Sequence, residues 1–494
     1  MRRILIATVV SSLALIGAPI PVLAQPAAES SPRADSPSSL RWTACEGKRL
    51  EGAQCAFLRV PRDWARPTEG TYRIAIARIR AEVAPTRGVL MFNPGGPGGA
   101  GLDALRFVQR GLPKEVRGSF DIVTFDPRGV GESQPTFAPC RTPQPDLPAT
   151  GPVDWEAATS AYVDTMSAAL QECLQANEAD AAYVGSWQVV RDIDALRRAL
   201  GVKKISFWGM SYGTTLGRAY AQQFPQRLRA LVLDGTITPT PSVGDYAREH
   251  IWDDATAIQV MLGAFGARSK RAYRTVMGFL EDQTIPTEDG DVLTRWSVSS
   301  YLVNKAAYQS QWDEAKQLIN ALHVVIRTSR AVSRDVARRI TSSAVTTRAG
   351  GGTNPAYHFV NCSDMHDRPS VRVIAGAAEE AAKVGGTALG ATPLGEGTQC
   401  AGLPALGRSV PPLAGTLRLP TPPVIVNSIG DNRTPWLGAR ETANAFTGSS
   451  MVTYAGTQHV TYTGTSACVD AAVTPYLLEL ARPPRSVACR LVLP

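Results

Sequence analysis

The sequence predicts an α/β fold, a mostly parallel β-sheet with helices on both faces, on the basis of three observations. Apolar strand patterns alternate with helical patterns over residues 41–236. The pentapeptide GMSYG (209–213), a G-x-S-x-G pattern, lies directly between a strand pattern and a helix pattern. Helical patterns dominate over 237–420, and strand patterns resume over 421–494. We therefore expect a two-part core with a largely helical lid inserted before its last two strands.

The individual elements follow from hydrophobic periodicity. Alternating or continuous apolar runs predict strands at 71–81, 88–93, 120–125, 204–208, 230–233, 422–428 and 450–454. Apolar residues three or four positions apart predict helices at 187–200, 214–224, 254–280 and 311–329. Gly201 follows the first of these helices as its stop signal, and a glycine-rich loop is expected at 349–353.

Ser211 is the candidate nucleophile. A serine on a tight strand-to-helix turn is held in a strained backbone conformation, and this turn lifts its hydroxyl clear of the sheet. Small residues two positions before and after the serine leave room for the bend, and Gly209 and Gly213 are those residues here. The sequence therefore predicts nucleophilic catalysis by Ser211.

An acid and a histidine should follow Ser211 in that order, on loops after late strands. Asp431 lies just past the strand at 422–428, and His459 follows the strand at 450–454. In this hypothesis His459 takes the proton of Ser211, and Asp431 orients the imidazole and stabilises its charged form. Asp234, which ends the strand at 230–233, is the alternative acid. It is disfavoured because the expected lid begins directly after it.

Acyl transfer also needs hydrogen-bond donors for the oxyanion. The strand at 88–93 runs into the glycine-rich segment 93–101, and glycines let backbone amides approach a ligand without intervening side chains. We expect the backbone N–H groups of Gly96 and Tyr212 to be the donors. Phosphate binding by this loop is disfavoured, because it has neither a G-K-[ST] ending nor G-x-G-x-x-G spacing.

Six segments in this order resemble the prolyl-iminopeptidase and tripeptidyl-aminopeptidase group of α/β-hydrolases. They are NPGGPGGAG (93–101), FDPRGVGES (125–133), WGMSYGTTLG (208–217), LVLDGT (231–236), GDNRTP (430–435) and the pair QH (458–459). The region from about residue 422 resembles the TAP-like C-terminal region of secreted bacterial members. Prolyl iminopeptidases usually have HGGPGG in the first segment. Pro94 stands in place of that histidine, which favours the tripeptidyl-aminopeptidase-like branch.

The resemblance implies an α/β-hydrolase fold and a serine exopeptidase that releases single residues or short peptides from free N-termini, without metal or cofactor. Some relatives are described as carboxylesterases, so ester hydrolysis by the same triad is the alternative function. A non-catalytic binding protein is disfavoured because Ser211, Asp431 and His459 are all present. The number of residues released per cleavage is left open.

Eight cysteines occur in the chain, and an even number in an exported protein points to disulfide bonds. Spacing alone leaves on the order of a hundred pairings open. The family resemblance implies sequential partners: Cys45–Cys55, Cys140–Cys173, Cys362–Cys400 and Cys468–Cys489. A metal site is disfavoured because no C-x-x-C spacing occurs. The residues His358, Cys362, Asp364 and His366, which are close in sequence, are expected to be structural.

An aminopeptidase also needs a carboxylate to bind the protonated substrate amine. The expected lid offers Glu249, Asp253, Asp254, Asp313, Glu314 and Asp364. Asp364 is the most interesting of these, because NCSD (361–364) resembles a recurrent lid motif of the family and a disulfide at Cys362 would fix it. A capping or salt-bridge role for Asp364 is the favoured alternative.

Residues 1–24 are expected to be a secretory signal peptide. Arg2 and Arg3 precede an apolar stretch at 4–16, and the segment 22–24 resembles a cleavage site. The apolar stretch is short for a membrane span, so we expect a secreted or periplasmic protein without a stable membrane anchor. Residues 25–40, rich in proline, serine and alanine, are predicted to be disordered.

Composition argues against nucleic-acid binding. The formal net charge of +8 falls to +6 without Arg2 and Arg3, and the excess is spread along the chain with no long basic run. Basic patches interleaved with aromatic residues, which nucleic-acid recognition would require, are absent from the sequence. Roughly 470 residues after the signal are enough for a hydrolase core with an insertion. The oligomeric state is left open.

Overall fold

The computed structural model describes residues 40–346, 355–413 and 415–493. The expected signal peptide, all but one residue of the expected disordered segment, and the glycine-rich loop at 349–353 lie outside these ranges.

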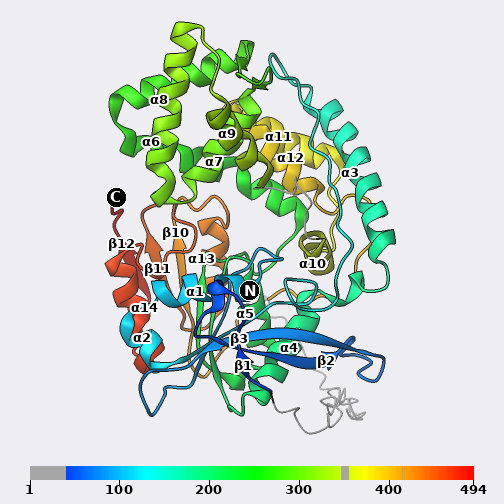
Figure 1. The fold of residues 1–494 in the computed structure, drawn as a ribbon, viewed down its shortest axis with the longest axis vertical. Coiled ribbons are helices and arrows are strands. Elements are labelled where there is room, and N and C mark those ends of the chain that lie inside the picture. Colours follow the sequence, from blue (N-terminus) through cyan, green and yellow to red (C-terminus); the bar gives the residue numbers. More distant parts are fainter. Residues whose placement is uncertain (1–39, 347–354, 414, 494) are drawn as a thin grey trace, which may run out of the picture. The chain divides into compact units, whose positions relative to one another are not determined.

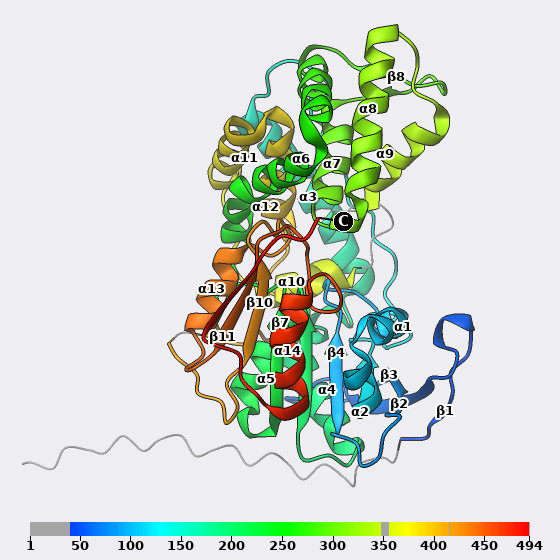
Figure 2. The ribbon, with the colours of Figure 1, turned by 90° about the vertical axis from the view of Figure 1, so that its left-hand side faces the viewer.

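A ten-stranded sheet forms the core, in the order β1-β2-β3-β5-β4-β6-β7-β10-β11-β12 (Figures 1 and 2). Its strands are β1 (Thr43–Ala44), β2 (Gln54–Pro61), β3 (Thr71–Ile79), β4 (Val89–Asn93), β5 (Asp121–Phe125), β6 (Ile205–Met210), β7 (Leu228–Asp234), β10 (Val424–Ser428), β11 (Ser450–Tyr454) and β12 (Ser486–Cys489). The pairs from β1 to β5 are antiparallel, and all pairs from β5 to β12 are parallel. Loops at the carboxyl ends of the parallel strands therefore meet at one edge, where open α/β sheets bind their ligands.

Helices cover both faces of the sheet. One face packs against α4 (Ser186–Ala199), α5 (Gly213–Gln223) and α13 (Trp436–Asn444), and the other against α1 (Gly101–Gly111), α2 (Lys114–Ser119) and α14 (Ala467–Glu479). Successive side chains alternate between the two faces, as Phe207 and Trp208 do in β6. Because both faces are buried, β6 consists of buried residues throughout, and the sequence shows an unbroken apolar run there.

The segment between β7 and β10 is largely helical. Its helices are α6 (Val243–Asp282), α7 (Arg295–Ala306), α8 (Trp312–Thr328), α9 (Arg334–Thr346), α10 (Ala356–Asp364), α11 (Val371–Gly385) and α12 (Ala391–Thr398), and it contains a small hairpin of β8 (Ile285–Pro286) and β9 (Val292–Leu293). Helices α6 to α9 enclose an apolar cluster of their own, which includes Met261 and Trp312. The lid therefore has a core separate from those of the sheet.

Two features of this architecture differ from the expectation. Three strands follow the lid in the described chain, so the prediction of two was wrong: β12 is a short, half-exposed edge strand with little apolar signal. A second segment of the chain, outside the insertion, also packs against the lid helices. Helix α3 (Trp155–Asn177), from the connection between β5 and β6, contacts α11 and α12 (Figure 1). Trp155 packs against Ala375 and Ala378.

Four disulfide bonds join the pairs that the family resemblance implies. Cys362–Cys400 ties α10 to the turn that follows α12. Disulfides of this number are typical of proteins in oxidising compartments, outside the cytosol. None of the helices in the described ranges combines the length and the apolar character that a membrane crossing requires.

Candidate active site

Ser211 lies on the turn between β6 and α5, with a φ of 54°. No side chain fits two positions before or after Ser211. A Cβ at Gly209 would lie 2.3 Å from the carbonyl oxygen of Gly213, and a Cβ at Gly213 would lie 2.4 Å from the carbonyl oxygen of Asn93. The Ser211 N–H donates to the Asp234 carbonyl (2.9 Å), and the Ser211 carbonyl accepts from the Thr214 N–H (2.9 Å). Ser211 therefore has the strained conformation that the pentapeptide predicts.

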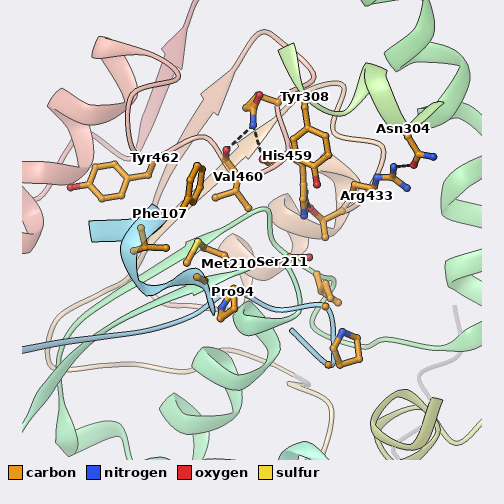
Figure 3. A pocket seen from close by; sticks show the side chains of 18 of the residues that line it. Pro94, Phe107, Met210, Ser211, Asn304, Tyr308, Arg433, His459, Val460 and Tyr462 are labelled. Atoms are coloured by element: carbon orange, nitrogen blue, oxygen red, sulfur yellow. Dashed lines mark hydrogen bonds between the residues drawn. The ribbon is translucent and has the colours of Figure 1, made fainter. Parts of the chain in front are cut away.

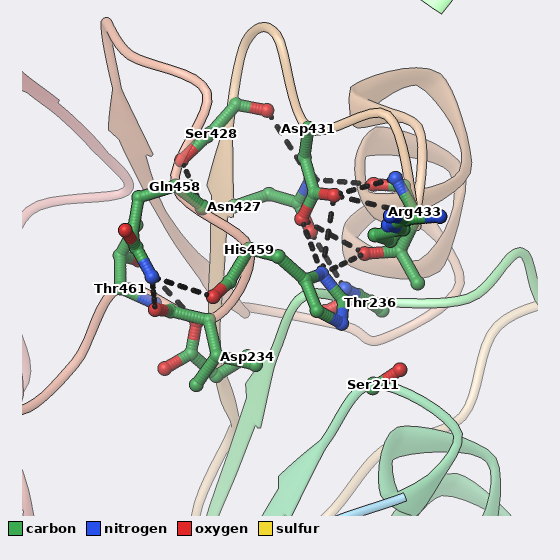
Figure 4. A network of polar contacts seen from close by, with 12 residues as sticks. Ser211, Asp234, Thr236, Asn427, Ser428, Asp431, Arg433, Gln458, His459 and Thr461 are labelled. Atoms are coloured by element: carbon green, nitrogen blue, oxygen red, sulfur yellow. Dashed lines mark hydrogen bonds and ion pairs between the residues drawn. The ribbon is translucent and has the colours of Figure 1, made fainter. Parts of the chain in front are cut away.

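Asp431 and His459 come together at the ends of β10 and β11 (Figure 4). The imidazole Nδ1 of His459 lies 2.9 Å from Asp431 Oδ2 and 3.1 Å from Oδ1. Asp431 is completely buried and His459 nearly so. In Figure 4 the imidazole lies between Asp431 and Ser211, so the three candidate residues are brought to one place.

The Asp431 carboxylate is held from several sides. Oδ1 accepts the backbone N–H groups of Arg433 (2.9 Å) and Thr434 (3.1 Å), and Oδ2 accepts the Thr434 hydroxyl (3.0 Å). These bonds explain the local sequence GDNRTP, in which a tight turn folds its own amides back onto the aspartate. The carboxylate is thereby aimed at the imidazole with little freedom to rotate.

Lid residues support the histidine loop. The backbone N–H of His459 donates to the carbonyl of Ala307, and the hydroxyl of Thr457 donates to that of Ala306, both at the end of α7. The side-chain oxygen of Gln458 accepts from the Gln309 N–H (3.1 Å). The lid therefore fixes the position of the histidine as well as covering the pocket.

Asp234, the alternative acid, has a different set of partners. Its Oδ1 accepts the Thr461 N–H and its Oδ2 the Tyr462 N–H, both at 2.9 Å. Burial raises the pKa of Asp234 to about 6. It thus anchors the loop that follows His459, while the imidazole bonds to Asp431.

The glycine-rich segment 93–101 passes directly under the turn that carries Ser211. A Cβ at Gly95 would lie 2.8 Å from the Tyr212 nitrogen and 2.9 Å from the Ser211 Cβ, so the close approach requires glycine there. The Gly95 N–H donates to Asn93 Oδ1 (3.0 Å). Gly96 is exposed and lines the same pocket as Ser211. The predicted oxyanion donors, Gly96 and Tyr212, thus belong to two adjoining loops.

A cavity of about 1090 Å³ opens over Ser211 and His459 (Figure 3). It is lined by the glycine-rich loop, α1, the histidine loop and the lid. Apolar side chains such as Phe107, Met210 and Val460 form part of the wall, and polar lid residues such as Tyr246, Tyr308 and Asn361 form another part. Ligand sites in proteins commonly enclose about 300–1,000 Å³, so this cavity is at least as large as a typical ligand site.

Comparison with known proteins identifies the family. A family model described as the α/β hydrolase fold matches residues 88–318, and one described as TAP-like protein matches residues 388–489. The chain is 30% identical to serine protease Hip1 of Mycobacterium tuberculosis, over 97% of this chain and 95% of that protein. The chain belongs to the α/β-hydrolase family. The predicted fold and the family resemblance are thereby confirmed.

Two other relatives of this hydrolase carry different names. It is 28% identical to the tripeptidyl aminopeptidase of Streptomyces lividans, over 88% of this chain and 83% of the relative. It is 27% identical to carboxylesterase B of Mycobacterium tuberculosis, over 91% of this chain and 89% of the relative. The family thus includes proteins named for peptide and for ester hydrolysis.

Asp364, the lid carboxylate singled out from the sequence, lies next to the start of α4 and the turn that carries Ser211. The side chain is absent from the cavity lining of the hydrolase. Its Oδ1 accepts the Ser186 N–H (3.0 Å), and its Oδ2 accepts the hydroxyls of Ser186 (2.6 Å) and Tyr212 (2.5 Å). These three hydrogen bonds favour a structural role for Asp364, the alternative that the sequence analysis preferred.

The other lid carboxylates considered from the sequence are also absent from the cavity lining. Burial raises the pKa of Glu249 to about 7 and that of Asp253 to about 8. Asp254 accepts bonds from Asn432 and Thr392, and Glu314 pairs with Lys305. Asp313 is exposed on α8.

Sequence analysis missed one acidic residue of the pocket. Among the described residues that line the cavity, Glu396 alone carries a carboxylate. It is buried on α12, close to the disulfide at Cys400. Its segment, ATPLGEGT, has little helical periodicity, and the only available signal was an acidic residue shortly before a lid cysteine.

Proposed function

We propose that this hydrolase is a secreted serine peptidase that cleaves peptide bonds near free N-termini by a Ser211–His459–Asp431 triad. The observation that carries the proposal is the imidazole of His459, bonded to the buried Asp431 and facing the strained Ser211 in one cavity. The relatives named as a serine protease and a tripeptidyl aminopeptidase support peptides as substrates. Export is supported by the signal-like segment 1–24 and the four disulfides.

The proposed reaction has two steps. Ser211 Oγ attacks the carbonyl carbon while His459 accepts the hydroxyl proton, and the developing oxyanion accepts hydrogen bonds from the N–H groups of Gly96 and Tyr212. The C–N bond then breaks, and His459 gives the proton to the leaving amine. Water, deprotonated by His459, then attacks the acyl carbonyl, the C–O bond to Ser211 breaks, and His459 gives the proton to Ser211 Oγ, which releases the N-terminal product and restores the enzyme. No other group is needed for atoms and charge to balance.

Glu396 is the proposed partner of the substrate amine. A protonated amine brought into this cavity needs a counter-charge, and a carboxylate forms a charge-assisted hydrogen bond with it. Glu396 lies on the lid side of the cavity, and Ser211 lies on the side of the sheet. A substrate that contacts both residues would be held by its free N-terminus under the lid, with the scissile bond at Ser211.

The decisive experiment compares a free-amine tripeptide arylamide with its N-acetylated form. We expect cleavage of the free-amine form to exceed that of the blocked form by at least about tenfold in kcat/KM, because a charge-assisted bond contributes about 1.5–3 kcal/mol. Equal cleavage of both would contradict the amine requirement. Negligible cleavage of both, together with rapid cleavage of an aryl ester, would favour the carboxylesterase alternative, which the relative named carboxylesterase B supports.

Glu396→Gln should raise KM for the free-amine peptide by about tenfold and leave the blocked peptide unchanged, because the variant keeps the shape and loses the charge. Steady-state kinetics on both substrates checks this. Glu379→Gln is the matched control, since Glu379 is exposed on the neighbouring lid helix α11. An equal change of KM for both substrates would exclude Glu396 as the amine partner.

A further inference from the structure

A polar cluster of Tyr212, Ser186 and the half-buried Asp364 lies directly behind the turn that carries Ser211. Tyr212, the residue after Ser211, is buried, and its hydroxyl donates to Asp364 Oδ2 at 2.5 Å. The Ser186 hydroxyl donates to the same oxygen at 2.6 Å and lies 2.6 Å from the Tyr212 hydroxyl. The Ser186 N–H donates to Asp364 Oδ1 at 3.0 Å. Three segments far apart in sequence therefore meet at one carboxylate.

Asp364 is itself firmly held. It ends α10, which lies between the lid helices and the core helices α4 and α5 (Figures 1 and 2). Two residues earlier, Cys362 is bonded to Cys400, and the Asn361 amide donates to Gln399 Oε1 at 2.8 Å. A Cβ at Gly185 would lie 2.7 Å from the Ser363 Cβ, so the backbones of α10 and the start of α4 are in close contact.

The nucleophile turn needs such support. A non-glycine residue at positive φ costs about 1–3 kcal/mol, and this strain persists only where the surrounding structure over-determines the conformation. Ser211 has that conformation, and Tyr212 is fixed on its far side by a hydroxyl bonded to a carboxylate. Even partial burial of a carboxylate is costly, and apolar packing alone would anchor a ring at lower cost. The presence of the Asp364 carboxylate is therefore best explained by its directional hydrogen bond, which fixes the orientation of the Tyr212 side chain.

We propose that Asp364 and Ser186 are positioning residues for Tyr212, which keep its backbone N–H aligned as an oxyanion donor and tie that alignment to lid helix α10. The inference rests on the proposed serine chemistry, but not on peptides being the substrate. Asp364 acts through Tyr212 and does not touch the substrate. The lid thereby contacts two parts of the proposed catalytic machinery. Helix α7 supports the histidine loop, and helix α10 supports the oxyanion donor.

Tyr212→Phe tests this proposal, because it keeps the ring and removes the hydroxyl. Loss of a whole oxyanion donor costs about 10²–10³ in kcat, and a loosened donor should cost less. We expect kcat to fall by about tenfold with KM changed less than twofold, equally for free-amine and blocked substrates. Asp364→Asn should lower kcat similarly, and the two changes together should cost no more than the larger one alone, because they break the same bond.

A fluorophosphonate provides a readout that does not depend on the natural substrate, because its phosphoryl oxygen occupies the oxyanion position when Ser211 is labelled. We expect the labelling rate of Tyr212→Phe to fall by about tenfold. Tyr220→Phe is the matched control: Tyr220 lies in helix α5, which begins directly after Tyr212, and donates its hydroxyl to Asp194 at 3.2 Å. Its labelling rate and kcat should equal those of the parent protein.

The outcomes separate this inference from the proposed function. Labelling of Tyr212→Phe at the parent rate would overturn the inference, as would a rise in KM for free-amine substrates alone. If Tyr212→Phe is unfolded, Ser186→Ala replaces it, with an expected fall of about threefold in labelling and a parent-like rate again contradicting the inference. Normal labelling of the parent protein without peptide cleavage would instead contradict the peptidase function alone.

Discussion

Ser211→Ala is expected to lower kcat by about 10⁴–10⁶ while leaving the fold intact, because removal of the nucleophile in a serine triad leaves only the contribution of binding and the oxyanion site. The backbone turn should survive, since alanine adopts a φ of 54° at a cost similar to that of serine and fits the same space. Initial rates on the free-amine arylamide, with circular dichroism as a check of folding, measure the effect.

Ser206→Ala is the control for this experiment. Ser206 lies in the same strand, β6, is buried, and is absent from the cavity lining. Its kcat should stay within twofold of the parent value. Residual activity of Ser211→Ala above about one per cent of the parent, in protein shown to be free of contaminating hydrolases, would mean that another group attacks the substrate.

The parts of the site that sequence analysis predicted are those that local geometry determines. The turn at Ser211 leaves no room for side chains at Gly209 and Gly213, so the two glycines of the pentapeptide are required by the local backbone conformation. Asp431 and His459 follow short apolar strands whose parallel pairing brings their carboxyl ends to one edge. Since Ser211, Asp431 and His459 each follow a parallel strand, their order along the chain predicts that they lie together at one edge of the sheet.

The lid was harder to interpret, because its contacts are long-range. Asp364 attracted attention through a motif, but its partners Ser186 and Tyr212 lie 178 and 152 positions away in the sequence, and no pattern near Asp364 points to them. Glu396 was missed because α12 is short and rich in small residues, and only the packing of α12 against α6 and α11 brings it to the cavity. The proposed amine site calls for a lid carboxylate, and the packing of the lid helices determines which carboxylate reaches the cavity.

Asp431→Asn is expected to lower kcat by about 10⁴, an effect known from a triad in which the aspartate became asparagine. The amide oxygen of the variant should face the backbone N–H groups of Arg433 and Thr434, which both donate to Oδ1. Its NH₂ group would then stand at the Oδ2 position, 2.9 Å from Nδ1 of His459. An NH₂ group donates there, so Nδ1 would have to accept and the ring proton would move to Nε2. That tautomer cannot take the proton of Ser211.

Asp234→Asn is the same substitution as Asp431→Asn at the other candidate acid, and comparing the two variants distinguishes a catalytic aspartate from a structural one. Both Asp234 oxygens accept backbone N–H groups, from Thr461 and Tyr462, so the amide loses one acceptor and loosens the loop after His459. We expect a lower Tm, with kcat reduced by tenfold at most. Comparable losses of kcat in the two variants would identify Asp234 as a second essential acid. A small loss of kcat in Asp431→Asn with a large loss of kcat in Asp234→Asn would identify Asp234 as the catalytic acid instead. Only the acid that orients the imidazole controls which ring nitrogen is free to accept the proton of Ser211.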